Sequence, residues 1–117
     1  MKKNNLLKRK CIPCEGGIPA LSKKEALIYL EGLKDWTLTP DGKGIRSEFI
    51  MKDFMDAIAF INRIAILAEK EDHHPNIHLT AYRKLVIKLS THAIGGLSEN
   101  DFILAAKISR LSKYFKI

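Results

Sequence analysis

The strongest constraint on the fold is a long apolar helical pattern that ends just before a proline. Residues 54–70 carry apolar side chains over most of their helical surface, and only a narrow polar stripe interrupts them. We expect this segment to form a largely buried central helix that begins after Asp53, a good N-cap residue. Pro75 disfavours the helical conformation at His74, so the helix must end by that residue.

Shorter patterns on both sides of this helix predict two strand pairs and two more helices. The expected elements are a helix from about 23 to 33 capped by Ser22 and Glu25, strands at 36–39 and 45–51, the helix at 54–70, strands from 77 and at 85–91, and a helix after Ser98. The order αββαββα predicts an α+β fold, a four-stranded antiparallel sheet with three helices on one face. The second face of the sheet would be wet or form a subunit contact.

A chain of 117 residues is long enough for one domain with one core. We expect residues 1–20 to form a basic, irregular extension and residues 21–117 to form the domain. The net charge of +7 suggests nucleic acid, but the first ten residues hold five basic residues and no acid. The rest of the chain is nearly balanced, so a solvated tail is favoured over a nucleic-acid-binding arm.

Cys11 and Cys14 form a CxxC pair, which is half of a zinc site or a redox pair. A structural zinc site needs four ligands, and the chain has no second pair, so a packed loop is the favoured interpretation. Two cysteines cannot build a disulfide framework, which indicates a reducing, cytoplasmic setting. No apolar run could cross a bilayer, and no apolar segment follows the basic N-terminus as in a secretory signal.

Residues 69–75, Glu-Lys-Glu-Asp-His-His-Pro, place two adjacent imidazoles at the expected end of the central helix. His92 falls at the end of a strand, and Asp101 follows nine residues later in the first turn of a helix. Such positions from distant segments can converge on one cleft. Imidazole gives and takes protons near neutral pH, so His73, His74 and His92 could perform general acid–base catalysis there.

Simpler interpretations of the same residues remain open. Adjacent histidines after a helix are often inert surface residues, and Asp101 could serve only as a capping residue. His78 alternates with apolar neighbours and is expected to be solvated. A metal site is disfavoured, because neighbouring histidines on an extended chain point apart and no carboxylate has clear ligand spacing.

Residues 69–75, Tyr82, the Leu-Ser-Thr-His run at 89–92 and the Gly-Leu-Ser-Glu-Asn-Asp run at 96–101 resemble the pterin-4a-carbinolamine dehydratase family. The similarity extends from about Leu21 to Ile108, and residues 11–17 resemble an N-terminal segment found in part of the family. The resemblance implies the fold expected above and a hydro-lyase. The reaction would convert 4a-hydroxytetrahydropterin to quinonoid dihydropterin, and so recycle the cofactor of an aromatic amino-acid hydroxylase.

The resemblance also assigns residues and partners. The implied catalytic residues are His73, His74 and His92, and the implied supporting or substrate-binding acids are Glu69, Asp72 and Asp101. The resemblance implies no metal or redox cofactor. It also implies that the protein forms a homodimer or a homotetramer. Alternative roles are a protein-binding dimerisation cofactor and a related step in molybdopterin metabolism. Residues 76–78, Asn-Ile-His, replace aromatic residues of the animal members, which leaves the preferred pterin open.

Overall fold

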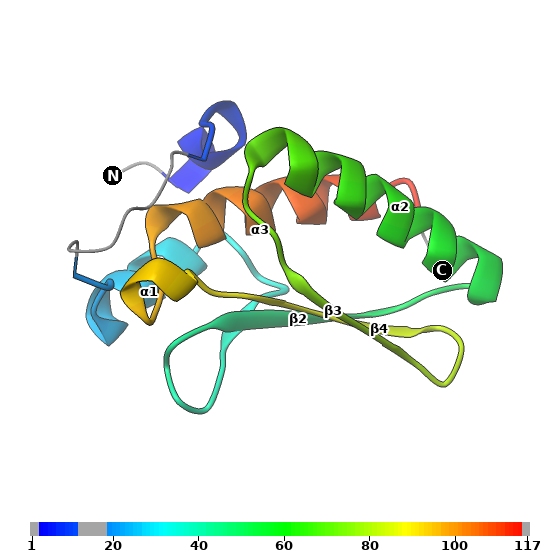
Figure 1. Ribbon diagram of the computed structural model, residues 1–117, viewed down its shortest axis with the longest axis horizontal. Helices are drawn as coiled ribbons and strands as arrows, with labels where there is room; N and C mark the ends of the chain where they lie inside the picture. The colour runs from blue at the N-terminus through cyan, green and yellow to red at the C-terminus, as the bar shows by residue number, and fades with distance from the viewer. Residues whose placement is uncertain (1–2, 12–18, 116–117) are drawn as a thin grey trace.

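Four antiparallel strands form one sheet in the order β1-β2-β4-β3, and α2 and α3 lie across one of its faces (Figure 1). The structure, a computed structural model, describes residues 3–11 and 19–115. The elements are η1 (Lys3–Lys8), α1 (Lys23–Leu30), β1 (Thr37–Leu38), β2 (Ile45–Ile50), α2 (Phe54–Glu71), β3 (Asn76–Thr80), β4 (Lys84–Leu89), η2 (His92–Ile94) and α3 (Glu99–Ser112). The predicted α+β class and the order αββαββα are confirmed.

The core lies between the sheet and the two long helices. Alternating residues of β2 and β4 face inward, and the register pairs Ile45 with Leu89 and Ser47 with Ile87. These four side chains are buried, as expected for a sheet that packs on one face only. Arg46 and its neighbours of the opposite phase therefore belong to the other, uncovered face of the sheet.

The helix α2 is buried on one side only, so the prediction that it is largely buried is wrong. A row at helical spacing packs inward, namely Ala57, Phe60, Ile64 and Ala68. The opposite side exposes apolar residues, including Met55 at 72% and Ile66 at 68% exposure. In a fold of two layers, a helix has the sheet on one side and no second layer on the other.

Several element boundaries differ from the predicted ones because turns take residues from the strand ends. β1 is only Thr37–Leu38, since Trp36 is buried in the preceding turn, where its indole Nε1 donates to Ser109 Oγ at 2.8 Å. β4 ends at Leu89, and Thr91 instead forms an isolated bridge with Gly96. His92 consequently begins a 3-10 turn rather than ending a strand.

Both predicted capping boxes are present. At the start of α1, the Glu25 amide donates to Ser22 Oγ at 3.1 Å, and the Ser22 amide donates to Glu25 Oε1 at 2.8 Å. Ser98 and Asp101 form the second box at the start of α3. Each box satisfies two amides that the helix itself leaves without acceptors.

The described part of the N-terminal segment packs against the domain, which differs from the expected solvated tail. Leu6 is 1% exposed, and η1 packs on α3. Cys14 and the rest of residues 12–18 lie outside the described residues. Gly96 is required where the chain returns, because a Cβ there would lie 2.8 Å from the Cβ of Ala20. Within residues 3–11 and 19–115, no helix has the length and apolar character needed to cross a membrane.

Candidate active site

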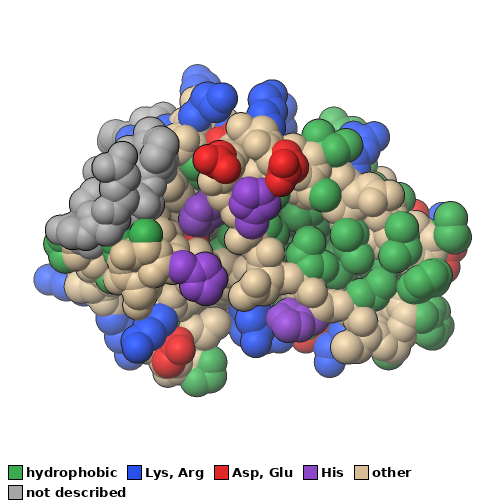
Figure 2. All heavy atoms as spheres, viewed as in Figure 1, with side chains coloured by type: hydrophobic (Ala, Val, Ile, Leu, Met, Phe, Trp, Pro, Cys, Tyr) green, Lys and Arg blue, Asp and Glu red, His purple; other side chains and the backbone are tan. Residues whose placement is uncertain are grey.

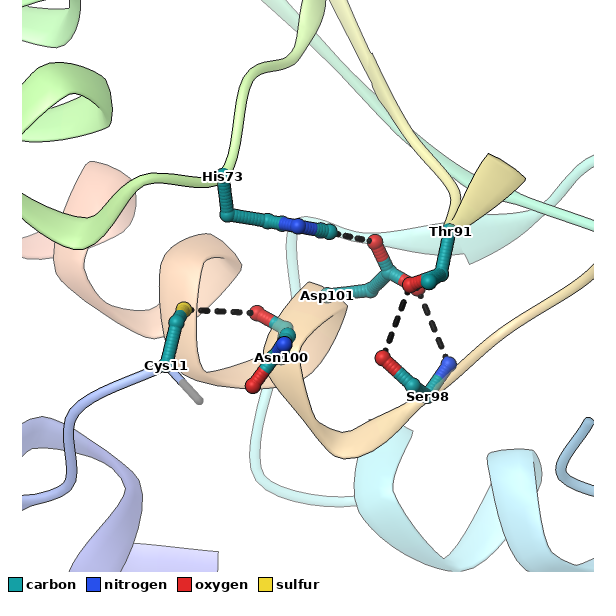
Figure 3. A network of polar contacts seen from close by, with 6 residues as sticks. All are labelled: Cys11, His73, Thr91, Ser98, Asn100 and Asp101. Carbon is teal, nitrogen blue, oxygen red and sulfur yellow. Dashed lines mark hydrogen bonds and ion pairs between the residues drawn. The ribbon is translucent and has the colours of Figure 1, made fainter. Parts of the chain in front are cut away.

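His73 and Asp101 form a hydrogen-bonded pair at the junction of α2, β4 and α3 (Figure 3). The His73 Nε2 atom lies 2.7 Å from Asp101 Oδ1. The Asp101 side chain is fully buried, and the His73 side chain is 12% exposed. His73 follows the end of α2, and Asp101 is in the first turn of α3, so the predicted meeting of a helix end and a helix start occurs at these two residues.

The second oxygen of Asp101 is held by two further donors. The Thr91 hydroxyl donates to Asp101 Oδ2 at 2.9 Å, and the Ser98 amide donates to the same oxygen at 3.0 Å. Thr91 Oγ1 and Ser98 Oγ lie 2.7 Å apart. The buried carboxylate is thereby fixed in position, and it in turn fixes the plane of the His73 ring.

His74 makes a second imidazole–carboxylate pair at the surface. Its Nε2 atom lies 2.6 Å from Glu69 Oε2, and both side chains are more than half exposed. The pair connects the residue after the helix to the last turn of α2. Water screens such a contact, so its effect on stability is small, and its main consequence is to orient the ring.

The side chains of the remaining predicted residues, His92 and Asp72, lie close in sequence to these pairs but form no hydrogen bond or ion pair with them among the described residues. His92 directly follows Thr91 and is exposed, and its imidazole forms no hydrogen bond or ion pair within the described part of the chain. Asp72 has a left-handed backbone, with φ of 54°, and forms the C-cap of α2. This turn reverses the chain between α2 and the two histidines. Figure 2 shows histidine and acidic side chains gathered on one face.

Glu71 and Lys107 form a buried contact that the sequence reasoning missed. Lys107 Nζ donates to Glu71 Oε2 at 2.6 Å, and the Cys11 amide donates to Glu71 Oε1 at 2.9 Å. The Lys107 side chain is only 17% exposed. The contact ties α2, α3 and the N-terminal segment together two residues before His73. The only sequence signal for this contact was a lysine on the side of α3 that is otherwise apolar.

The pKa values of two groups reflect this buried contact. Burial alone would raise the pKa of Glu71, but the hydrogen bonds from Lys107 and the Cys11 amide outweigh it and hold the pKa below its usual value. Burial, together with the nearby negative charge of Glu71, raises the pKa of the Cys11 thiol to about 12. The thiol donates to the carbonyl oxygen of Asn100 at 3.5 Å (Figure 3). Cys11 is therefore an unreactive, packed thiol at neutral pH.

A polar cluster holds the first turn of α3 from its other side. The Tyr29 hydroxyl donates to Glu99 Oε2 at 2.9 Å, and Arg9 forms an ion pair with the same carboxylate. Burial and the bond to Glu99 raise the pKa of Tyr29 to about 12. The Tyr29 ring stacks on Phe102, with ring centroids 4.7 Å apart. These contacts fix the helix start that carries Asp101.

Two properties of the site bear on its chemistry. The described residues contain no group of three or more histidine, cysteine, aspartate or glutamate side chains arranged to hold a metal ion. A recess of about 670 Å³ has Asn76 and Ser90 in its lining, and each of these residues is two positions from a histidine in the chain. The site thus combines imidazoles and carboxylates, which are groups suitable for moving protons on a small molecule.

Comparison with known families decides what kind of protein carries this site. The family model described as pterin 4 alpha carbinolamine dehydratase matches residues 19–111. The chain belongs to the pterin-4a-carbinolamine dehydratase family. The match spans the sheet, both long helices, the histidine stretch and Asp101, so the resemblance seen in the sequence is confirmed. Members of this family are hydro-lyases, and the family supports a dehydratase activity on a pterin carbinolamine.

Proteins similar in sequence to this chain carry the name of the family. A relative from Dechloromonas aromatica is 44% identical over 107 residues, which cover 92% of this chain and 93% of the relative. One from Nitrosospira multiformis is 45% identical over 108 residues, with 92% and 93% covered. Both are named, provisionally, as pterin-4-alpha-carbinolamine dehydratases.

Two solved structures share the fold of this family. The Brucella melitensis protein described as a transcriptional coactivator/pterin dehydratase has a TM-score of 0.74 and 33% identity, and the match covers 79% of this chain and 97% of that one. A pterin dehydratase-like protein described as a RuBisCO assembly factor in the alpha-carboxysome has a TM-score of 0.57 and 22% identity, with 67% and 89% covered. The second likeness shows the fold alone.

Proposed function

We propose that this protein removes water from 4a-hydroxytetrahydropterin by histidine acid–base catalysis and releases quinonoid dihydropterin. The observation that carries the proposal is the buried His73–Asp101 pair, held by Thr91, whose neighbour in the chain is His92. A carboxylate that orients an imidazole is the arrangement by which a protein fixes the ring and its tautomer for proton transfer. The substrate would come from a hydroxylation of an aromatic amino acid, which leaves the pterin as its 4a-carbinolamine.

The proposed chemistry needs two proton transfers and no electron transfer. One group protonates the hydroxyl on C4a, which leaves as water, and another takes the proton from N5 as the C4a–N5 double bond forms. Because a carboxylate only accepts hydrogen bonds, the hydrogen of a neutral His73 ring is on Nε2, and Nδ1 is left as the basic nitrogen. We assign the N5 proton to His73. His74 and His92 are exposed and can take up a proton from water for delivery to the hydroxyl.

The supporting acids have different roles in this proposal. Asp101 acts through His73, so it is a positioning residue. Glu69 orients the His74 ring in the same way at the surface. Asp72 contributes its left-handed turn, which places both histidines beyond the end of α2.

The test is a stopped-flow assay of quinonoid dihydropterin formation from the 4a-carbinolamine, with His73→Ala, His74→Ala and His92→Ala beside the wild type. Loss of a general acid or base is expected to lower kcat by about 10²–10⁴-fold. His78→Ala is the matched control, because His78 is an exposed histidine of β3 outside the proposed site, and we expect it to retain wild-type activity. A wild type no faster than the buffer-catalysed reaction would refute the proposal.

We also propose that the protein assembles as a homodimer or homotetramer through the exposed side of α2. Met55, Ala59, Asn62 and Ile66 are exposed and fall on one side of the helix, since they are spaced by three or four residues. Exposed apolar residues that cluster on one helix face are typical of an interface. The described part of the chain offers no layer that covers this face.

A further inference from the structure

A recess on the uncovered face of the sheet is lined by residues that the proposed chemistry does not use. Its volume is about 670 Å³, and its lining includes Lys43, Arg46 and Lys88, with Thr37, Asn76 and Ser90. The register explains the grouping, because Thr37, Arg46, Lys88 and Asn76 are consecutive cross-strand neighbours on β1, β2, β4 and β3. One row across the sheet thus forms the floor.

The recess has an excess of positive charge. The register sets Arg46 directly opposite Lys88, a like-charge pair that destabilises a sheet. Lys88 forms no ion pair within residues 3–11 and 19–115, and Arg46 has only a long contact of 3.8 Å with Glu48. Glu48 also forms an ion pair with Lys84, whose Nζ atom lies 3.9 Å from Glu48 Oε2.

The one acidic residue in the lining does not offset this charge fully. Asp41 is engaged by its own turn, since the Thr39 hydroxyl donates to it at 2.7 Å and the Lys43 amide at 2.9 Å. These bonds lower the pKa of Asp41, with the Lys43 amide as the main cause. Three cations therefore share the recess with one carboxylate. A like-charged pair whose charge is only partly balanced by nearby carboxylates is an arrangement that a bound anion would stabilise.

Two residues of the recess lining lie close in sequence to the histidines of the proposed site. Asn76 lies two residues after His74, and Ser90 lies two residues before His92. Two residues of extended chain span about 7 Å, so the recess starts within one small-molecule length of both histidines.

The geometry points to a subsite for a negatively charged group on the C6 side chain of the pterin, and this inference rests on the proposed function. In a pterin, C6 is bonded directly to N5, so its substituent leaves the ring at the reacting edge. With N5 and C4a at the histidines, the substituent extends over Asn76 and Ser90 towards Lys88 and Arg46. The substrate class is therefore a reduced pterin whose side chain ends in a phosphate monoester or a carboxylate, rather than a neutral side chain.

The two anions differ in how they use the recess. Both are bound by Arg46 through paired N–H groups and by Lys88 as a point charge. A phosphate monoester carries more charge and more acceptor oxygens, so it can engage Lys43 as well. Measuring a carboxylate substrate and a phosphate substrate in one assay shows which of the two anions the recess prefers.

The experiment compares three 4a-carbinolamines that share the pterin ring and differ at C6, with a methyl, a carboxylate or a hydroxymethyl phosphate group. The kcat/KM of each is measured for wild type, Arg46→Gln and Lys88→Gln. Lys84→Gln is the matched control, since Lys84 is an exposed lysine of the same strand as Lys88 and lies outside the recess. Circular dichroism and thermal unfolding verify that each variant is folded.

We expect the wild type to favour at least one anionic substrate over the methyl compound by about tenfold or more, mainly through KM. Arg46→Gln and Lys88→Gln should reduce the ratio of kcat/KM for the anionic substrate to kcat/KM for the methyl substrate, and Lys84→Gln should keep that ratio. Added salt should weaken the preference as well.

The outcomes separate the two ideas. A wild type that dehydrates the methyl compound but shows no anion preference refutes the subsite and leaves the dehydratase proposal in place. The same holds if Lys84→Gln loses as much preference as Lys88→Gln. A wild type that dehydrates none of the three compounds refutes the dehydratase proposal, and the subsite inference with it.

Discussion

At the scale of single residues, Asp101 has more functions than any other side chain of the site. It caps α3, accepts from Thr91 and the Ser98 amide, and holds His73. All of these contacts are made by a carboxylate that is fully buried. Capping and catalysis were alternative explanations of Asp101 from the sequence, and the geometry shows that one side chain can serve both.

The variant Asp101→Asn tests the positioning role. An amide has the same size but offers a donor on one side, so either His73 or Thr91 loses its acceptor. We expect kcat for the carbinolamine to fall by about 10²–10⁴-fold, with a smaller change in KM. Glu69→Gln, at the exposed His74 pair, should cost less than about tenfold. A purely structural role would instead give Asp101→Asn an unchanged kcat per folded molecule, and that result would contradict the account.

The residues of the site could be predicted to different extents. The meeting of His73 and Asp101 could be predicted, because a helix end and a helix start are places where distant segments meet. Thr91 lay within the quoted Ser-Thr-His run but had no assigned role, since a threonine at a strand end has many ordinary partners. The Glu71–Lys107 contact could not be foreseen, because it depends on how two helices pack.

At the scale of elements, Glu71 and Lys107 join α2 to α3 beside the site. Ionised Glu71 is held by Lys107 and the Cys11 amide, and the pKa of Glu71 is below its usual value. A lowered pKa in the folded state means that the stabilisation is complete above the unfolded pKa, about 4.3, and is lost as the pH falls below it.

We expect Glu71→Gln to destabilise the fold by about 3 kcal/mol at pH 7, because Lys107 would be left without its buried partner. Between about pH 5 and pH 3, the variant should also lose less stability than the wild type does. Urea unfolding at a series of pH values measures both effects. Glu69→Gln, an exposed change on the same helix, is the control. Parallel stability curves for Glu71→Gln and the wild type would show that Glu71 makes no such contribution.

Most of the element order was predictable, and the boundaries and burial were less so. The capping boxes and the alternation in residues 45–50 depend on local chemistry, which the sequence displays directly. The extent of burial around α2 depends on how many layers the fold has, and apolar periodicity alone does not report that number. The same apolar face that gave a wrong prediction of burial now indicates where another subunit would pack.

At the scale of the whole molecule, the exposed side of α2 leads to a prediction about assembly. Met55 and Ile66 lie on one side of the helix, and both are more than two-thirds exposed. We expect the double variant Met55→Lys/Ile66→Lys to form a smaller assembly than the wild type, because charges at the centre of an apolar interface are costly. Light scattering after size-exclusion chromatography gives both masses. The proposed interface would be contradicted if the wild type has the mass of a single chain. It would also be contradicted if the wild type and the double variant have equal masses.

At this scale, His73 and His74 follow the end of α2 and His92 begins η2. The account depends on all three histidines serving one pterin. The most direct measurement is a titration of the protein with a non-reacting reduced pterin analogue, followed by the NMR signals of the four imidazole rings. We predict saturable shifts at His73, His74 and His92, with His78 unchanged as an internal control. Saturation with no shift at His73 and His92, or a shift at His78 alone, would contradict the proposed site.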